Sequence, residues 1–160
     1  IRETLFNWLA SHIEGARCLD LFAGSGALSF EALSRGAASC VAIDNSAEVV
    51  AQLRTNQAIL EASDLQLLTM DSRDYLKSKN TDPAFDIVFI DPPFASGLCD
   101  QIIRLVTQKN WLSNKALIYC EMPTSEQLWV PPNWQLQKEK KAGEVKYCLY
   151  QHIELASQLK

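Results

Sequence analysis

Apolar residues recur along this chain in two alternating patterns, short continuous runs and longer stretches with helical spacing. A short apolar run bounded by turn residues is typical of a buried strand, whereas apolar residues three or four positions apart are typical of a helix. These patterns predict strands over 17–22, 39–43, 65–70, 85–90 and 116–122. They predict helices over 1–13, 26–35, 71–79 and 98–109, and one more that follows its cap, Ser46.

The last part of the chain predicts a different kind of pairing. Pro131-Pro132 interrupt it, and two strands over 134–140 and 146–153 then flank Ala142-Gly143, as in an antiparallel hairpin. Strands that alternate with helices predict a mostly parallel sheet with right-handed crossovers. We therefore expect a doubly wound α/β fold: one domain over 1–160 with a seven-stranded sheet, parallel order 3-2-1-4-5 and a C-terminal hairpin.

Composition fits one globular domain, because 160 residues with 48% apolar and 21% charged side chains can form a single core. No apolar run approaches the ~20 residues that span a bilayer, so we expect no membrane association. Five cysteines without a C-x-x-C pair or a cysteine–histidine cluster predict no metal site and a reducing, cytoplasmic location. The net charge of -4 does not indicate a nucleic-acid-binding protein, although it can mask a local basic surface.

The segment Cys-Leu-Asp-Leu-Phe-Ala-Gly-Ser-Gly at 18–26 predicts a strand, a tight turn and a helix start. Gly24 and Gly26 have no Cβ, so their backbone and the helix N-terminus can approach a ligand closely. Ser29 occupies the third glycine position of the dinucleotide fingerprint, which weakens an NAD interpretation. Asp20 would repel a pyrophosphate and suits a cationic ligand instead.

Acidic residues also follow the second and third predicted strands. Asp44 lies 20 positions after Gly24 and can accept both ribose hydroxyls of an adenosine, or it can simply flank the next helix. Asp71 can bond an adenine amino group while Ser72 caps the following helix, or it can be only a cap itself. Both interpretations stay open for each residue.

Asp91-Pro92-Pro93-Phe94 follows the fourth strand and is the most specific motif in the chain. Two prolines fix two φ angles and remove two N–H donors, which leaves a stiff loop with free carbonyl oxygens. Asp91 and the Pro92 carbonyl can accept the two hydrogens of an exocyclic amine, while Phe94 stacks on the base. In the order 3-2-1-4-5 this loop meets the glycine loop where the strand order reverses.

These motifs, together with Arg-Glu-Thr-Leu-Phe-Asn-Trp-Leu at 2–9, resemble the bacterial 16S ribosomal RNA guanine-N2 methyltransferase family, which belongs to the class I S-adenosylmethionine-dependent enzymes. The resemblance implies S-adenosylmethionine as donor, S-adenosylhomocysteine as product and a guanine of 16S rRNA as acceptor, within an assembled or assembling small ribosomal subunit. It implies a monomeric, cytoplasmic enzyme and catalytic contacts from Asp91, Pro92, Pro93 and Phe94. It implies cofactor contacts from Arg2, Thr4, Asp20, Phe22, Ala23, Gly24, Ser25, Gly26, Asp44, Asn45, Asp71, Ser72 and Asp91.

Other functions stay open. An adenine-N6 methyltransferase of DNA or RNA also has an aromatic residue after the prolines, although this chain shows no DNA target-recognition insertion. A small-molecule methyltransferase, an NAD-binding module or a non-catalytic nucleotide- or RNA-binding domain are further alternatives. The family's basic segment before the Arg-Glu-Thr run is absent here, so we expect RNA contacts from there in addition to those from this chain. Candidate RNA contacts, or charges that protect an edge strand, are Lys138, Lys140, Lys141 and Lys146, with Arg73, Lys77 and Lys79 on a helix.

Overall fold

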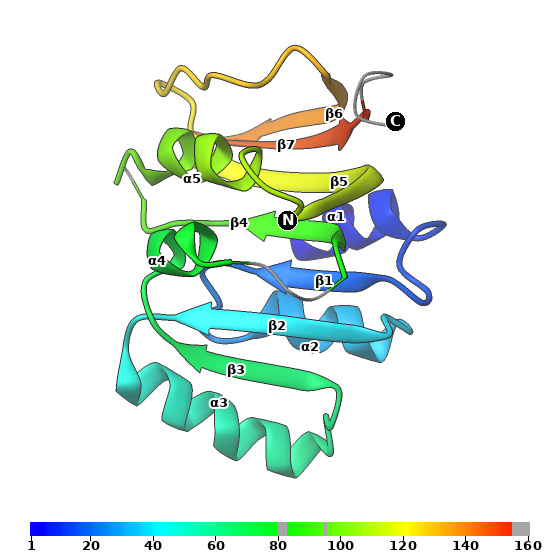
Figure 1. Ribbon diagram of the computed structural model, residues 1–160, viewed down its shortest axis with the longest axis vertical. Coiled ribbons are helices and arrows are strands. Elements are labelled where there is room, and N and C mark those ends of the chain that lie inside the picture. Colours follow the sequence, from blue (N-terminus) through cyan, green and yellow to red (C-terminus); the bar gives the residue numbers. More distant parts are fainter. Residues whose placement is uncertain (80–82, 95, 155–160) are drawn as a thin grey trace.

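Seven strands form a single sheet in the computed structural model, which describes residues 1–79, 83–94 and 96–154 (Figure 1). The strand order is β3-β2-β1-β4-β5-β7-β6. The strands are β1 (Arg17–Asp20), β2 (Ser39–Asp44), β3 (Leu65–Thr69), β4 (Phe85–Ile90), β5 (Leu112–Pro123), β6 (Trp134–Ala142) and β7 (Val145–His152). The helices are α1 (Arg2–Leu9), α2 (Ala27–Ser34), α3 (Ala47–Leu60), α4 (Ser72–Lys77) and α5 (Leu98–Val106).

The parallel part of the sheet has the predicted order. β1 pairs in parallel with both β2 and β4, while β3 and β5 extend the sheet on either side. β7 then pairs antiparallel with β5 and β6, so the C-terminal hairpin forms one edge. The predicted α/β fold with a closing antiparallel hairpin is therefore confirmed. The chain adds β2 and β3 on one side of β1 and then β4 and β5 on the other, so the strand order reverses at β1.

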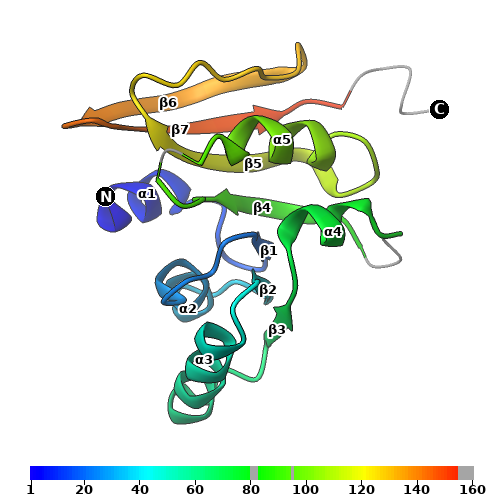
Figure 2. The ribbon, with the colours of Figure 1, turned by 90° about the vertical axis from the view of Figure 1, so that its left-hand side faces the viewer.

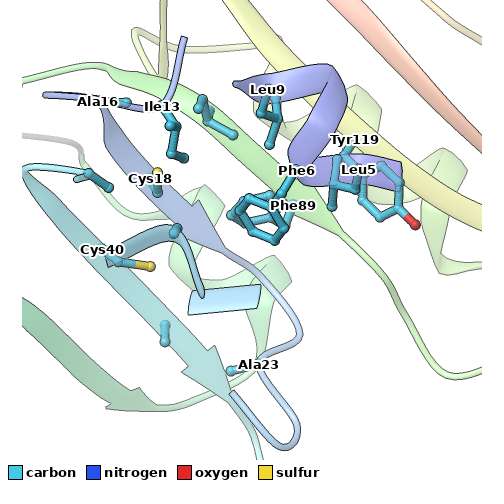
Figure 3. Packing of buried hydrophobic residues seen from close by; sticks show 14 of the residues in the cluster. Leu5, Phe6, Leu9, Ile13, Ala16, Cys18, Ala23, Cys40, Phe89 and Tyr119 are labelled. Atoms are coloured by element: carbon cyan, nitrogen blue, oxygen red, sulfur yellow. The ribbon is translucent and has the colours of Figure 1, made fainter. Parts of the chain in front are cut away.

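Helices cover both faces of the sheet. Figure 2 shows α1, α2 and α3 on one side and α4 and α5 on the other. On the first side, Leu5, Phe6 and Leu9 of α1 are fully buried, and the Phe6 ring lies 6.1 Å from that of Phe89 (Figure 3). On the second side, α5 buries Ile102, Ile103 and Val106, as its helical spacing predicts. Each face thus has its own apolar core.

Several boundaries differ from the predicted ones, chiefly at polar ends. The first helix ends at Leu9 rather than near Ile13, and α5 ends at Val106 rather than at 109. β5 begins at Leu112, before the apolar run, because backbone pairing with β4 does not require apolar side chains. Lys115 interrupts that early part with a positive φ of 68°.

Two helix caps lie beside the site. Ser46 caps α3 as predicted, since its hydroxyl oxygen accepts the Val49 N–H at 3.3 Å. Of the two interpretations left open for the next helix, capping by Asp71 is confirmed and capping by Ser72 is not: Asp71 is the N-cap of α4, and its carboxylate accepts the Arg73 N–H at 2.7 Å. The buried Ser72 hydroxyl instead donates to the Leu21 carbonyl, which ties the start of α4 to the end of β1.

Candidate functional site

The glycine loop joins β1 to α2, and its two glycines have different roles. Gly26 is the N-cap of α2 with a φ of 81°, and a Cβ there would lie 2.6 Å from Leu53 and 2.7 Å from the Phe30 ring. Only glycine can therefore let α2 pack this closely on α3. Gly24 also has a positive φ, 54°, but, apart from Gly24 and its two chain neighbours, no described residue has an atom within 4 Å of its Cβ position. Its backbone faces open space, where a ligand can approach.

Asp44 holds this loop in place from the end of β2. Its Oδ2 accepts the Gly24 N–H at 3.0 Å, and its Oδ1 accepts the Ser46 N–H at 3.0 Å. A carboxylate offers about four acceptor positions, so each oxygen retains capacity for a further donor. Asp44 thus combines a structural role with free acceptor capacity toward the cavity beside it.

A cavity of about 470 Å³ lies between the glycine loop and the Asp-Pro-Pro loop after β4. Its volume is within the range of ~300–1,000 Å³ that small-molecule sites occupy. The predicted meeting of the two loops is therefore confirmed. The sequence-predicted residues that line it are Phe22, Ala23, Gly24, Ser25, Asp44, Asn45, Asp71, Ser72, Asp91, Pro92 and Pro93.

Sequence reasoning missed part of the cavity wall. Most of the missed lining residues are apolar and lie close in the chain to predicted site residues, and only that adjacency could have indicated them. The exception is a cation, Arg73, which comes two positions after the predicted Asp71. The missed lining residues are Leu21, Ala27, Leu28, Met70, Arg73 and Leu98.

Arg73 forms a bidentate pair with Asp71, and its Nη1 also donates to Gln101 Oε1 at 3.4 Å. Its Nε and Nη2 lie 3.0 and 2.9 Å from the two carboxylate oxygens, and these hydrogen bonds are the main reason that the pKa of Asp71 is lowered to about 2. The pair is close to neutral overall. Asp71 therefore has fewer free acceptor positions for an adenine amino group than the sequence alone suggested, and that predicted contact stays a prediction.

Asp20 lies behind the glycine loop rather than in the cavity wall. Its side chain is 1% exposed and accepts a hydrogen bond from the Ser29 hydroxyl at 2.7 Å. Burial raises the pKa of Asp20 to about 6, against the opposing effect of the hydrogen bond from Ser29. Asp20 thus connects β1 to α2 from inside the core, and a contact with a cofactor stays a prediction.

Four other predicted residues also lie outside the wall of this cavity, and one of them is Gly26, the N-cap of α2. Arg2 and Thr4 belong to α1, where the Arg2 guanidinium lies 3.9 Å from Glu31 on α2. Phe94 is 63% exposed and lines a second cavity of about 120 Å³. The two cavities share Asp91, Pro92 and Pro93, so the proline loop forms the partition between them.

The site is acidic. Burial is the main reason that the pKa of Asp91 is raised to about 7, and repulsion from Glu121 and Asp20 adds to it. Neither Asp44 nor Asp91 forms an ion pair with any residue that the structure describes. Because Arg73 is paired with Asp71, the larger cavity presents two uncompensated carboxylates, an environment that favours a cationic ligand.

The basic residues do not form a single surface. Lys138, Lys140 and Lys141 are exposed on the edge strand β6, whereas Lys146 of β7 lies 3.9 Å from Glu139. Figure 1 places this hairpin at one edge of the sheet and α4, which contains Lys77, nearer its middle.

Within residues 1–79, 83–94 and 96–154, no group of His, Cys, Asp or Glu is arranged to hold a metal ion. No helix in that part of the chain is long and apolar enough to span a bilayer.

Comparisons with known proteins agree with this geometry. A family model described as Conserved hypothetical protein 95 matches residues 1–151. Ribosomal RNA small subunit methyltransferase D of Haemophilus influenzae is 46% identical over 95% of this chain and 80% of its own length. The protein of that name from Escherichia coli K12 is 47% identical over 94% of this chain and 76% of its own length. The solved structure of Escherichia coli yhhF, described as a candidate methyltransferase, is 46% identical with a TM-score of 0.92, covering 96% of this chain and 86% of that one.

The buried carboxyl of Asp20 predicts a pH-dependent stability. Its pKa is 3.8 when unperturbed and about 6 in the folded protein, so the stability it contributes is complete below the lower value and is lost as pH rises through about 6. Asp20→Asn, which can still accept the Ser29 hydroxyl, should remove this loss. In urea unfolding, the free energy of unfolding of the variant relative to that of the wild type should increase by up to about 3 kcal/mol as pH rises from about 4 to about 7. Asp64→Asn, at an exposed position, should show no such gain; equal pH profiles for all three proteins would contradict this role of Asp20.

Proposed function

This chain belongs to the family described as Conserved hypothetical protein 95, that of the ribosomal RNA small subunit methyltransferases D, and from this premise we propose its reaction. It transfers a methyl group from S-adenosylmethionine to the exocyclic N2 amine of a guanine in 16S rRNA. The observation that supports this most is the cavity shared by the glycine loop and the Asp-Pro-Pro loop. It would place a cofactor-sized ligand directly beside acceptors suited to a planar amine.

The residues of the larger cavity fit an adenosine with a cationic side chain. Asp44 has free acceptor capacity for ribose hydroxyls, and Gly24 leaves open space beside its backbone. The uncompensated charge of Asp44 favours a sulfonium and an ammonium group, whereas it would repel the pyrophosphate of NAD. When bound, the cofactor supplies a methyl group on a positively charged sulfur, and its departure leaves S-adenosylhomocysteine.

The proline loop would orient the acceptor. Asp91 and the Pro92 carbonyl accept the two hydrogens of the amine, which holds the nitrogen in line for attack, and such positioning accounts for much of the rate of group transfer. The nitrogen must lose one proton as its new bond to carbon forms. A carboxylate with a pKa of about 7 can accept that proton near neutral pH. Phe94, exposed at the rim of the smaller cavity, can stack on the base.

The macromolecular context is part of the proposal. A base inside a helix must be turned out of its stack before its amine can enter a cavity, so the acceptor is an unpaired or flipped guanine. Lys138, Lys140 and Lys141 offer phosphate contacts along the exposed edge of β6. We place the reaction on the assembled or assembling small subunit in the cytoplasm, with a single copy of the enzyme acting on each particle.

Asp44 should be required for cofactor binding. Asp44→Ala removes the acceptor for the ribose and also the bond that positions Gly24, so the affinity for S-adenosylmethionine should fall by roughly 1–3 kcal/mol. Isothermal titration calorimetry measures this directly. Asp64→Ala also removes one carboxylate, but at an exposed position away from the cavity, and should bind as the wild type does. An unchanged dissociation constant for Asp44→Ala would exclude Asp44 from the site.

Asp91 should control the rate and its pH dependence while leaving cofactor affinity nearly intact. Only the ionised carboxylate can accept both an amine hydrogen and the departing proton, so kcat/KM should rise with pH and level off above a pKa of about 7. Asp91→Asn should lower methyl transfer by about 100-fold or more and remove that inflection. Calorimetry with S-adenosylmethionine on the same variant is the control. An equal loss of affinity and rate, or an unchanged inflection, would show that this assignment of Asp91 is wrong.

A further inference from the structure

The smaller cavity, on the other side of the Asp-Pro-Pro loop, has a chemistry of its own. Its walls are mostly apolar, and its charged side chains are all carboxylates. Among the residues that the structure describes, neither lysine nor arginine lines it. Such a space fits a flat ring whose edge presents hydrogen-bond donors. The lining residues that bear on its chemistry are Asp91, Phe94, Glu121 and Glu126.

Glu121 is the best-positioned of these carboxylates. It lies near the end of β5, two residues after Tyr119, and so on the same face of the strand. The Tyr119 side chain is fully buried, and its hydroxyl donates to Glu121 Oε2 at 2.7 Å. Among the described residues, none donates to the other oxygen, Oε1. The half-buried Glu121 therefore has one anchored oxygen and one that can accept from a ligand.

Glu121 and Asp91 face the same cavity. Both line the smaller cavity, and the charge of Glu121 contributes to the raised pKa of Asp91. Two carboxylates that repel each other are stabilised together by a ligand that offers hydrogens to both. On a purine ring, such a pair of donors exists where a ring N–H lies next to an exocyclic amine.

We propose that Glu121 accepts the N1–H of the acceptor guanine and thereby selects guanine over adenine, a role that rests on the proposed function. Guanine presents the N1–H donor next to its N2 amine, whereas adenine presents an N1 lone pair next to its N6 amine. An ionised carboxylate can only accept, so adenine would place two acceptors against each other. Buried polar groups left without a partner are how binding sites reject close analogues. Glu121 is in this sense a specificity-determining residue, while Asp91 holds the reacting amine.

The test uses 2-aminopurine, which keeps the N2 amine but has a lone pair at N1. Small-subunit particles are reconstituted from rRNA that contains either guanine or 2-aminopurine at the methylated position, and methyl transfer from S-adenosylmethionine is measured. The wild-type enzyme should prefer guanine by about 10-fold or more, the effect of one unpaired buried group. In Glu121→Gln the amide can donate to the N1 lone pair, so the ratio of guanine to 2-aminopurine rates should fall by about 10-fold.

Two further variants make the assignment specific. Glu126→Gln removes the same charge from the same cavity and should leave the ratio unchanged. Tyr119→Phe keeps the Glu121 charge but removes its anchor, so it should lower the ratio even if Glu121→Gln does not fold. A wild-type enzyme that leaves the guanine particle unmethylated would overturn the proposed function itself. Methylation of guanine with a ratio insensitive to both Glu121→Gln and Tyr119→Phe, or equally sensitive to Glu126→Gln, would overturn only the role of Glu121.

Discussion

The site depends on the pairing of β1 with β2 on one side and β4 on the other. Leu19 is in register with both Val41 and Val88, and the Leu21 N–H continues the pairing to the Phe89 carbonyl at 3.2 Å. Because all three strands are parallel, the loops that follow them leave the sheet at the same edge. The sheet order reverses at β1, so no helix fills the space between the glycine loop and the proline loop. The cavity is a consequence of this topology.

Buried carboxyl groups in the cavity wall and behind it carry an electrostatic cost in stability. Asp20 and Asp91 have raised pKa values mainly because they are buried, so each ionised form is unfavourable in the free protein. A ligand that brings positive charge or hydrogen-bond donors relieves that cost, whereas an anionic ligand increases it. Arg73 does not offset these charges, because it is paired with Asp71. An acidic site next to a rigid proline loop thus suits a cationic methyl donor and an amine acceptor.

Much of the fold and the site could be predicted from the sequence, because the strands are continuous apolar runs and the motifs lie at their ends. Gly24, Asp44 and Asp91 were predicted to meet, and all three line one cavity. The cap of α4 stayed open between Asp71 and Ser72 because both are good capping residues, and only the burial of Ser72 and the Arg73 N–H bond to Asp71 decide it. Glu121 was not predicted at all. It interrupts an apolar run, and only its place in the wall of the smaller cavity, beside Asp91, Pro92 and Pro93, shows that it faces the proline loop.

The proposed function requires that the two adjoining cavities bring a methyl donor to the N2 amine of a guanine in small-subunit rRNA. The most direct measurement is mass spectrometry of nucleosides from that rRNA, isolated from cells with and without the gene for this chain. One N2-methylguanosine should be lost on deletion and restored by the wild-type gene. Unchanged N2-methylguanosine, or the loss of an N6-methyladenosine instead, would contradict the proposed function.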